Sequence, residues 1–150
     1  MADKLVLVGA SGWQHAAWRG AFYPDDLPED WQLPYYATRF QAVWLPAASW
    51  QDASDATWET WLHDSHDGFH FVLEPAAGAR AVPASARVRL ATPEWQARHV
   101  WWLDQVPDLR QLAQRIGQHA EAGEPLYVFS RRGDLRLLEQ ALTLVQVMGY

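Results

Sequence analysis

Residues 4–11 read KLVLVGAS and form the first apolar run of the chain. The run is short, almost continuous and closes on a glycine, which is typical of a strand buried on both faces of a parallel sheet. Comparable runs recur along the sequence: FQAVWLP at 40–46, FHFVLEP at 69–75, a weaker RVRLA at 87–91, RHVWWLD at 98–104 and EPLYVFSRR at 124–132. We therefore predict about five to six strands, with the weaker run at an edge.

Helical patterns lie between these runs. Local spacing predicts a capping residue for each helix: Asp30 for a helix that runs to Phe40, Ser49 with Asp52 for one that ends near Gly68, Asp108 for one that ends at Gly123, and Asp134 for the last. In the last two helices apolar residues recur at every third or fourth position. The alternation of strands and helices indicates βαβ units around a parallel sheet, which is an α/β fold.

Length and composition favour one domain over residues 1–150. Apolar residues make up 49% of the chain and charged residues 20%, which excludes a disordered chain. No apolar run approaches the roughly 20 residues that a membrane span needs, so we expect no membrane partner. Residues 76–86, AAGARAVPASA, are small and featureless, and we predict a flexible loop there.

The chain has no cysteine, which excludes disulfides, thiolate metal ligands and a cysteine nucleophile. The opening residues MADKLVLVGASG lack the long apolar stretch of a signal peptide. From these two features we expect a cytoplasmic location.

The charge of the chain is negative and uneven. A net charge of -6 argues against nucleic-acid binding, because phosphate contacts need a basic surface. Residues 1–75 carry three Lys and Arg against eleven Asp and Glu, whereas residues 76–150 carry nine against seven. This division indicates either an acidic half beside a mixed half, or two surfaces of opposite charge that pair in a homo-oligomer.

The stretch VGASGWQHAAWRGAFYP at 8–24 joins a Ser-Gly-Trp turn to a Trp-x-Gly-x-Phe-Tyr-Pro segment, and LPEDWQLPYYATRFQAV follows at 27–43. Together they resemble the YecE-like family of domains of unknown function (domain of unknown function 72). DATWETWLHDSHDGFHFVLEP at 55–75 is similar to the family's second helix and third strand. Residues 108–146 are more loosely similar to its closing helix, strand and helix.

The resemblance implies a barrel of the TIM type. Family members are longer by several barrel elements, and the missing part would fall around residues 76–97. We therefore expect a TIM-barrel-like but truncated fold, an open or partial barrel with flanking helices.

The sequence departs from the family at the ends of its strands. Trp44-Leu45-Pro46 stands where the family has a Glu-x-Asn segment, Glu74 precedes Pro75 where a Lys is usual, and Ser130-Arg131-Arg132 stands where Asn-rich residues are common. Barrel enzymes place their chemistry at these strand ends, so the departures argue against an inherited activity.

The first candidate site is the turn after the first strand. GASG at 9–12 begins like the nucleophile elbow G-x-S-x-G, but its fifth position is Trp13, so we interpret Ser11 as a turn residue. The aromatic residues that follow form either core or a rim that stacks a ring-shaped ligand. In the second case Ser11 and Trp13 would line the ligand site, and His15 and Arg19 would supply polar contacts.

Two further candidate sites lie at strand ends. Glu74 and Asp104 are candidates for a catalytic acid/base pair, or they cap the turns that follow. Ser130 and Arg131, with Arg132, precede the last helix and could hold an anion at its N-terminus, or they form a solvated loop.

His63, His66 and His70 offer the ligand types that bind zinc or nickel. Nothing in their spacing makes the three imidazoles converge, and we expect no metal and no cofactor.

Three functions follow from these observations. The leading interpretation is a non-catalytic or catalytically decayed domain of the YecE-like type that binds a small molecule or associates. The alternative is an enzyme that acts on a small polar or phosphorylated substrate at the carboxyl ends of the strands, through Glu74, Asp104, His15 and Arg131. The third is a homo-oligomer that buries exposed tryptophans and an open sheet edge.

Overall fold

The computed structural model describes residues 4–78 and 81–150. The strands of these residues are β1 (Val6–Ala10), β2 (Ala42–Leu45), β3 (His70–Leu73), β4 (Val88–Leu90), β5 (Val100–Trp102) and β6 (Leu126–Ser130). The α-helices are α1 (Gln32–Arg39), α2 (Ala47–Trp50), α3 (Asp55–His63), α4 (Pro93–His99), α5 (Leu109–Ala122) and α6 (Leu135–Met148). Two 3-10 turns cover Ala16–Trp18 and Glu29–Trp31. None of the described helices is long and apolar enough to cross a bilayer.

The strands form two three-stranded sheets, in the orders β1-β6-β5 and β2-β3-β4. Every pairing is parallel. The predicted α/β fold with parallel strands is therefore confirmed, and each predicted apolar run contains a strand, including the edge strand β4. The described residues form no closed barrel, because β4 and β5 each pair on one side only.

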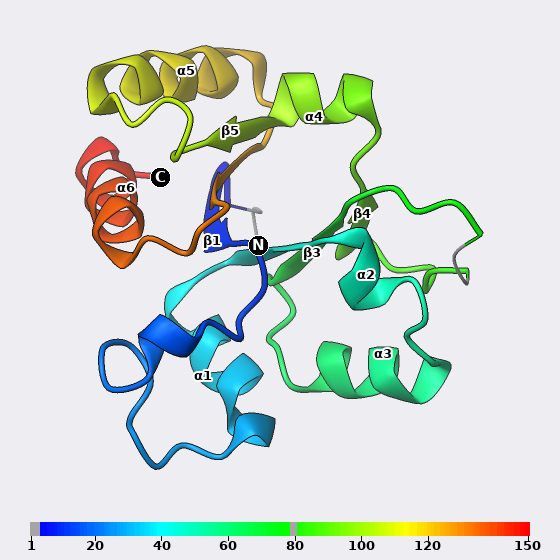
Figure 1. The fold of residues 1–150 in the computed structure, drawn as a ribbon. Helices are drawn as coiled ribbons and strands as arrows, with labels where there is room; N and C mark the ends of the chain where they lie inside the picture. Colours follow the sequence, from blue (N-terminus) through cyan, green and yellow to red (C-terminus); the bar gives the residue numbers. More distant parts are fainter. Residues whose placement is uncertain (1–3, 79–80) are drawn as a thin grey trace.

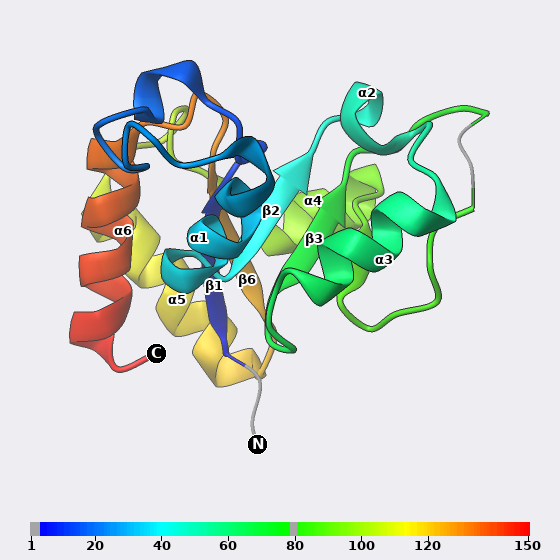
Figure 2. The ribbon, with the colours of Figure 1, turned by 90° about the horizontal axis from the view of Figure 1, so that it is seen from below.

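The two sheets lie side by side, with β1 next to β2 (Figure 1, Figure 2). At their carboxyl ends the Gly12 N–H donates to the Trp44 carbonyl at 2.8 Å. Ser11 forms a parallel bridge with Trp44. At the other ends the Gln41 N–H donates to the Val8 carbonyl at 3.1 Å. Hydrogen bonds thus join the strands above and below a central gap in the ladder.

A tyrosine from α1 fills that gap. The Tyr36 hydroxyl accepts a hydrogen bond from the Ala10 N–H at 2.7 Å and donates one to the Ala42 carbonyl at 2.7 Å. Both backbone groups are buried, and a buried backbone group without a partner costs free energy. Burial also raises the pKa of Tyr36, so its hydroxyl keeps the proton that it donates.

Gly9 allows β1 and β2 to approach so closely. A Cβ atom at Gly9 would lie 1.8 Å from the Ala42 carbonyl oxygen and 2.6 Å from the Tyr36 hydroxyl. Any larger residue would separate the two strands and displace the hydroxyl that bridges them. The glycine that closes the first apolar run therefore determines the junction between the sheets.

Each face of the strands has its own core. One face packs against α1, α3, α5 and α6, and Tyr36, Phe40 and Ile116 are fully buried there. The other face carries a separate cluster of large rings, listed here with their neighbours: Leu7, Ala42, Trp44, Val72, Val100, Trp102, Tyr127 and Phe129. The Trp44 and Trp102 rings lie 5.0 Å apart at its centre. Helix α4 packs Trp95 against this second cluster.

Two predicted helix starts are wrong. Asp30 lies inside a 3-10 turn, and α1 begins at Gln32 without a side-chain cap. Pro34, the third residue of α1, has no N–H for a cap to bind. Ser49 lies inside α2, and Ser54 caps the following helix instead. Glu74, which is distant in sequence, caps α2: its carboxylate oxygen accepts from the first N–H of the helix at 2.9 Å. Local spacing does not reveal such a contact.

The predicted strand at 98–104 begins later than expected. Helix α4 occupies residues up to His99, and Thr92 with Pro93 begins it, a start signal that the sequence analysis did not use. The caps at Asp108 and Asp134 are confirmed, because each carboxylate accepts from two N–H groups of the first helical turn. Of the predicted loop at 76–86, residues 79–80 lie outside the described residues.

The Tyr36 bridge gives a test of the junction. Tyr36→Phe should lower the free energy of unfolding by about 2–3 kcal/mol in urea titrations, because it leaves two buried backbone groups without a partner. Tyr35→Phe is the matched control: Tyr35 is half-buried on the same helix, and this change should cost less than about 0.5 kcal/mol. Equal losses in the two variants would show that the hydroxyl does not hold the sheets together.

Candidate functional site

The loop after β1 folds back on itself around His15. The His15 Nε2 atom lies 2.7 Å from the Ser11 carbonyl, and its ring lies 4.4 Å from the ring of Trp18. Gly133, with φ +65°, packs on the imidazole so closely that a Cβ there would lie 2.7 Å from it. His15 is therefore held between the loop that follows β1 and the loop that precedes α6.

Two buried side chains fix the rest of this loop. The Tyr23 hydroxyl donates to the Trp13 carbonyl at 2.5 Å, and the Trp18 indole N–H donates to the Gly133 carbonyl at 2.8 Å. Trp18 and Tyr23 are buried, and burial raises the pKa of Tyr23. The stretch from 13 to 23 is thus a rigid wall whose inner rings belong to the core.

The outer side of this wall is hollowed. One hollow of about 350 Å³ lies at the ends of β1 and β2, between Ser11, Ser49 and Trp61, and we call it the Ser11 hollow. A second of about 510 Å³ lies between the start of α1 and the end of α3, beside Trp31 and Asp64, and we call it the Trp31 hollow. Both are lined by Trp13, Gln14 and Trp61. We call the two together the tryptophan groove.

A smaller hollow of about 210 Å³ continues past Gln14 to His15 and Arg19. The Arg19 guanidinium donates to the Asp25 carbonyl at 3.0 Å, and the Gln14 amide donates to Glu29 at 2.8 Å. Gln14 and Glu29 also line the Trp31 hollow, so the hollows adjoin one another.

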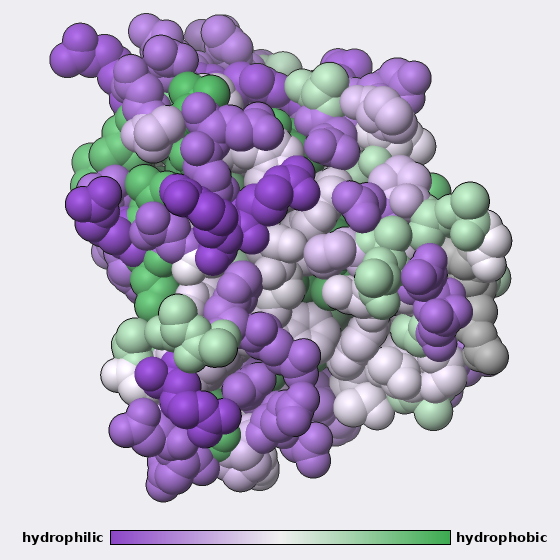
Figure 3. Space-filling model, viewed as in Figure 1, coloured by the Kyte–Doolittle hydropathy of each residue, from purple (hydrophilic) through white to green (hydrophobic). Residues whose placement is uncertain are grey.

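The rings of the groove differ in burial. Trp13 is buried, and its ring meets the Trp61 ring edge to face at 5.4 Å. Trp61 is half-buried and also contacts Trp58 and Phe71. Trp31 is 62% exposed, the largest side chain among the described apolar residues that face solvent. Figure 3 shows side chains of intermediate hydropathy over the middle of this face, and hydrophilic ones over the loop before α1.

The polar groups at the strand ends bind within the protein. Glu74, at the end of β3, accepts from the Ala47 N–H, and its carbonyl accepts from the Trp50 indole at 2.9 Å. Asp104, after β5, accepts from the Ser130 hydroxyl at 2.9 Å and from the Arg131 and Arg132 N–H groups. The two carboxylates thus bind different loops.

The Asp104 carboxylate occupies the kind of cradle that binds an anion. Its side chain is 11% exposed and also pairs with the Arg132 guanidinium at 3.3 Å. Burial acts to raise the pKa of Asp104, but the hydrogen bonds from residues 130–132 outweigh it and hold the pKa below its ordinary value. The donors of residues 130–132, where an anion site was one of two predicted alternatives, therefore bind an internal carboxylate.

Arg131 covers the second ring cluster. Its guanidinium lies 3.9 Å from the centre of the Trp102 ring and 6.0 Å from that of Trp44. Trp44 is buried, and among the described residues its indole N–H has no hydrogen-bond partner. One polar group at the strand ends is therefore unused.

The predicted ligand residues fall into two groups. Ser11 and Trp13 line the groove, and His15 and Arg19 line the hollow beside it. Ser130 and Arg131 lie around Asp104, and only a backbone hydrogen bond from Ser11 to Ser130, at 3.0 Å, connects the groups. Their roles stay predictions.

Trp31, Trp61 and Asp64 line the groove but were not predicted as site residues. Trp31 lies in an irregular stretch, and Trp61 continued the apolar pattern of α3, so neither gave a local signal. Only the packing of α1 beside α3 brings these residues around one hollow.

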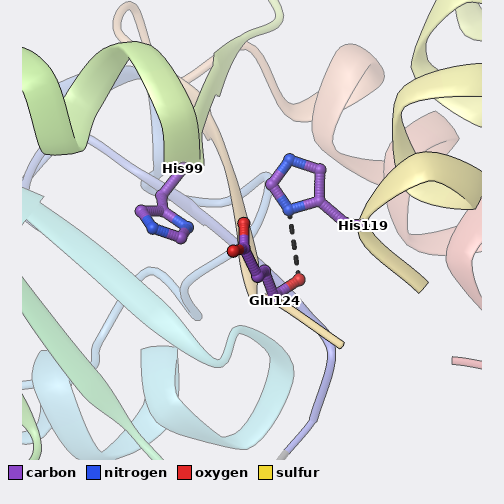
Figure 4. A group of neighbouring side chains, drawn as sticks. All are labelled: His99, His119 and Glu124. Atoms are coloured by element: carbon purple, nitrogen blue, oxygen red, sulfur yellow. Dashed lines mark hydrogen bonds between the residues drawn. The ribbon is translucent and has the colours of Figure 1, made fainter. Parts of the chain in front are cut away.

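The predicted histidines do not converge. His66 accepts from the Gly68 N–H at 3.1 Å, whereas His70 contacts the Tyr127 hydroxyl at 2.7 Å on the other face of the sheet. Another set, His99, His119 and Glu124, offers ligand atoms within 4.8 Å of one another (Figure 4). It lies where α4, α5 and the start of β6 meet.

Arginines already bind two members of this set, Glu124 and His119. The Glu124 carboxylate forms a double hydrogen bond with the Arg98 guanidinium. His119 contacts the Glu124 carbonyl through Nδ1 at 3.1 Å, and its Nε2 accepts from Arg115 at 3.0 Å. A metal ion would have to displace both guanidinium groups, so the set anchors three elements rather than forming a ready cation site.

An apolar hollow of about 700 Å³ follows the outer side of α6, beside Leu135, Leu144 and Val147. Figure 3 shows hydrophobic side chains where α6 lies. Val147 is 78% exposed.

Comparison with known proteins gives one family. The family model described as Protein of unknown function DUF72 matches residues 7–78, just under half of the chain. The match contains the stretches 8–43 and 55–75, and the resemblance to this family is confirmed there. The looser stretch 108–146 lies outside it. No curated protein and no solved structure matches the chain.

Removal of the Asp104 carboxylate should let residues 130–132 bind an anion from solution. Asp104→Ala should lower the free energy of unfolding by about 2 kcal/mol, because it removes the shared acceptor of the buried Ser130 hydroxyl and of two backbone N–H groups. Sulfate should then raise the Tm of this variant more than that of Asp108→Ala, which loses an exposed helix-cap carboxylate of the same charge. An equal effect of sulfate on both variants would mean that residues 130–132 form no anion site.

His119 predicts a loss of stability in mild acid. Burial, with the charge of Arg115, lowers the pKa of His119 below its ordinary value of 6.5. The unfolded chain therefore binds the proton more readily, and the free energy of unfolding should fall as the pH falls through 6.5 towards the lower folded-state pKa.

His119→Gln should flatten that part of the pH profile measured by urea unfolding. His63→Gln, which changes an exposed histidine at the end of α3, should keep the wild-type slope. If His119→Gln keeps the wild-type dependence of the free energy of unfolding on pH, another group is responsible for it.

Proposed function

We propose, from the resemblance to the DUF72 family over residues 7–78, that this chain is a ligand-binding domain that catalyses no reaction. Its ligand would lie in the tryptophan groove. Residues 1–150 would form one domain, built on the strand order of a TIM-type barrel opened between β4 and β5. The observation that carries the proposal is the contrast between this groove and the strand ends of β3, β5 and β6.

Large rings crowd the face that would line the inside of such a barrel. The rings of Trp44, Trp102 and Phe129 pack on the face that would line it, with centres 5.0–6.1 Å apart. Arg131 lies over the Trp102 ring at the end of this cluster. A barrel enzyme keeps an open mouth there, with free polar groups around it.

The carboxylates of the strand ends support the same conclusion. A catalytic acid or base must reach a substrate atom within hydrogen-bond distance. Glu74 binds the first N–H of α2, and Asp104 accepts from a hydroxyl and two N–H groups, so both are occupied in structural roles.

The groove supports a binding function. Its two hollows measure about 350 and 510 Å³, within the range of small-molecule sites. A rigid wall backs it, because the Tyr23 hydroxyl holds the backbone at Trp13. A ligand that covers an exposed aromatic side chain such as Trp31 removes apolar surface from water, which stabilises the complex.

The second candidate function is the enzyme on a small polar or phosphorylated substrate. The unused indole N–H of Trp44, beneath the Arg131 guanidinium, favours it. A homo-oligomer stays a prediction, and the apolar hollow along α6 is the surface that favours it.

The ten tryptophans give a direct test. Each indole N–H gives its own signal in a ¹H–¹⁵N spectrum of the intact chain, and Trp→Phe variants assign them. Titration with a library of small neutral, cationic and anionic fragments should shift the Trp13, Trp31 and Trp61 signals together.

Shifts confined to Trp44 and Trp102 would overturn the proposal in favour of a strand-end site. Signals that stay in place with every fragment would also overturn it. Trp101, which is half-buried in β5 and lines neither hollow of the groove, serves as the internal control and should not shift.

A further inference from the structure

We infer that the Trp31 hollow binds a small alkylated ammonium ion, such as the head group of a quaternary amine. This inference rests on the proposed function and names the ligand class of the same groove. It follows from the charges, the rings and the size of this hollow.

Three carboxylates line the Trp31 hollow. Glu29 and Asp30 belong to the 3-10 turn before α1, and Asp64 follows α3 on the opposite side. Neither lysine nor arginine is among its described lining residues. None of the three carboxylates takes part in an ion pair within residues 4–78 and 81–150. The hollow therefore has a negative potential that a cation would neutralise.

Two arginines, Arg87 and Arg19, donate hydrogen bonds to backbone carbonyls outside this hollow. Arg87, which contacts the end of α3, donates to the carbonyls of Leu62 and Phe69. Arg19 lies in the adjoining His15 hollow, where it donates to the Asp25 carbonyl. Neither arginine lines the Trp31 hollow. We therefore expect its carboxylates to bind a cation from solution.

Two tryptophans of the Trp31 hollow can bind the cation through their rings. Trp31 is 62% exposed, and Trp61 is half-buried, on opposite sides of the hollow. Indole faces attract cations more strongly than other aromatic side chains do. An alkylated ammonium ion presents apolar methyl groups to the rings and has little hydration to lose. Carboxylates together with tryptophans thus favour it over a neutral ring-shaped ligand.

A neutral sugar would use the rings but not the charges. The indole N–H groups and the carboxylates of the hollow could hydrogen-bond its hydroxyls, but a neutral ligand leaves the three negative charges without a counter-charge. A small anion is excluded by the same charges.

The test compares choline with 3,3-dimethyl-1-butanol, which has the same shape but no charge. Both are titrated into the intact chain, and the indole signals of Trp31 and Trp61 are followed. Choline should bind at least about tenfold more tightly than the neutral alcohol, because only choline gains the cation–π and carboxylate terms.

Variants locate the site. Asp64→Asn and Trp31→Leu should each weaken choline binding several-fold, and added salt should weaken it in the wild type. Asp52→Asn removes the same charge outside the hollow and should leave choline binding unchanged. Circular dichroism of each variant checks that it is folded.

Equal binding of choline and the neutral alcohol would overturn the inference and leave the proposed groove intact. Absence of choline binding, with neutral fragments still shifting the groove tryptophans, would overturn it in the same way. If no fragment of any charge shifts these signals, the proposed function itself fails.

Discussion

The hydroxyl of Tyr36 determines how the two sheets meet. It is the only described side chain that binds backbone groups of β1 and β2 at once, with both contacts at 2.7 Å. Gly9 leaves the space in which it sits, and the loop after β1 starts at the junction that it fixes. The positions of Ser11 and Trp13, and with them the wall of the tryptophan groove, follow from this contact.

The junction also separates two kinds of surface. On one face of the strands, rings of Trp44, Trp102 and Phe129 fill the space, and polar groups nearby bind one another. On the outer side, the Trp31 hollow lies between α1 and α3, and the Ser11 hollow lies beside Trp61 of α3. The proposed ligand therefore lies in the tryptophan groove rather than at the ends of β3, β5 and β6.

Local features were predictable from the sequence. The Asp108 and Asp134 caps use N–H groups two and three residues away, so spacing alone indicates them. The strand runs were also correct, because strands buried on both faces must be continuously apolar. Asp30 failed as a cap because residues 29–31 form a 3-10 turn, so that α1 begins only at Gln32, with Trp31 at the capping position.

Contacts between distant residues were not predictable in this way. The Tyr36 hydroxyl, the Asp104 cradle and the pairing of Trp31 with Asp64 each join segments at least six residues apart, and most join different elements. The sequence identified His15 and Trp13 as residues next to a ligand site but did not contain the opposite wall. That wall comes from α3, where the Trp61 ring packs on Trp13 of the loop.

The central claim is that a ligand binds outside the strand ends, between α1 and α3. A crystal structure of the protein grown with arsenocholine, in which arsenic replaces the ammonium nitrogen, tests it most directly. The account predicts an anomalous arsenic peak between Trp31, Trp61 and Asp64. A peak beside Arg131 and Trp102, or none in crystals that diffract well, would contradict it.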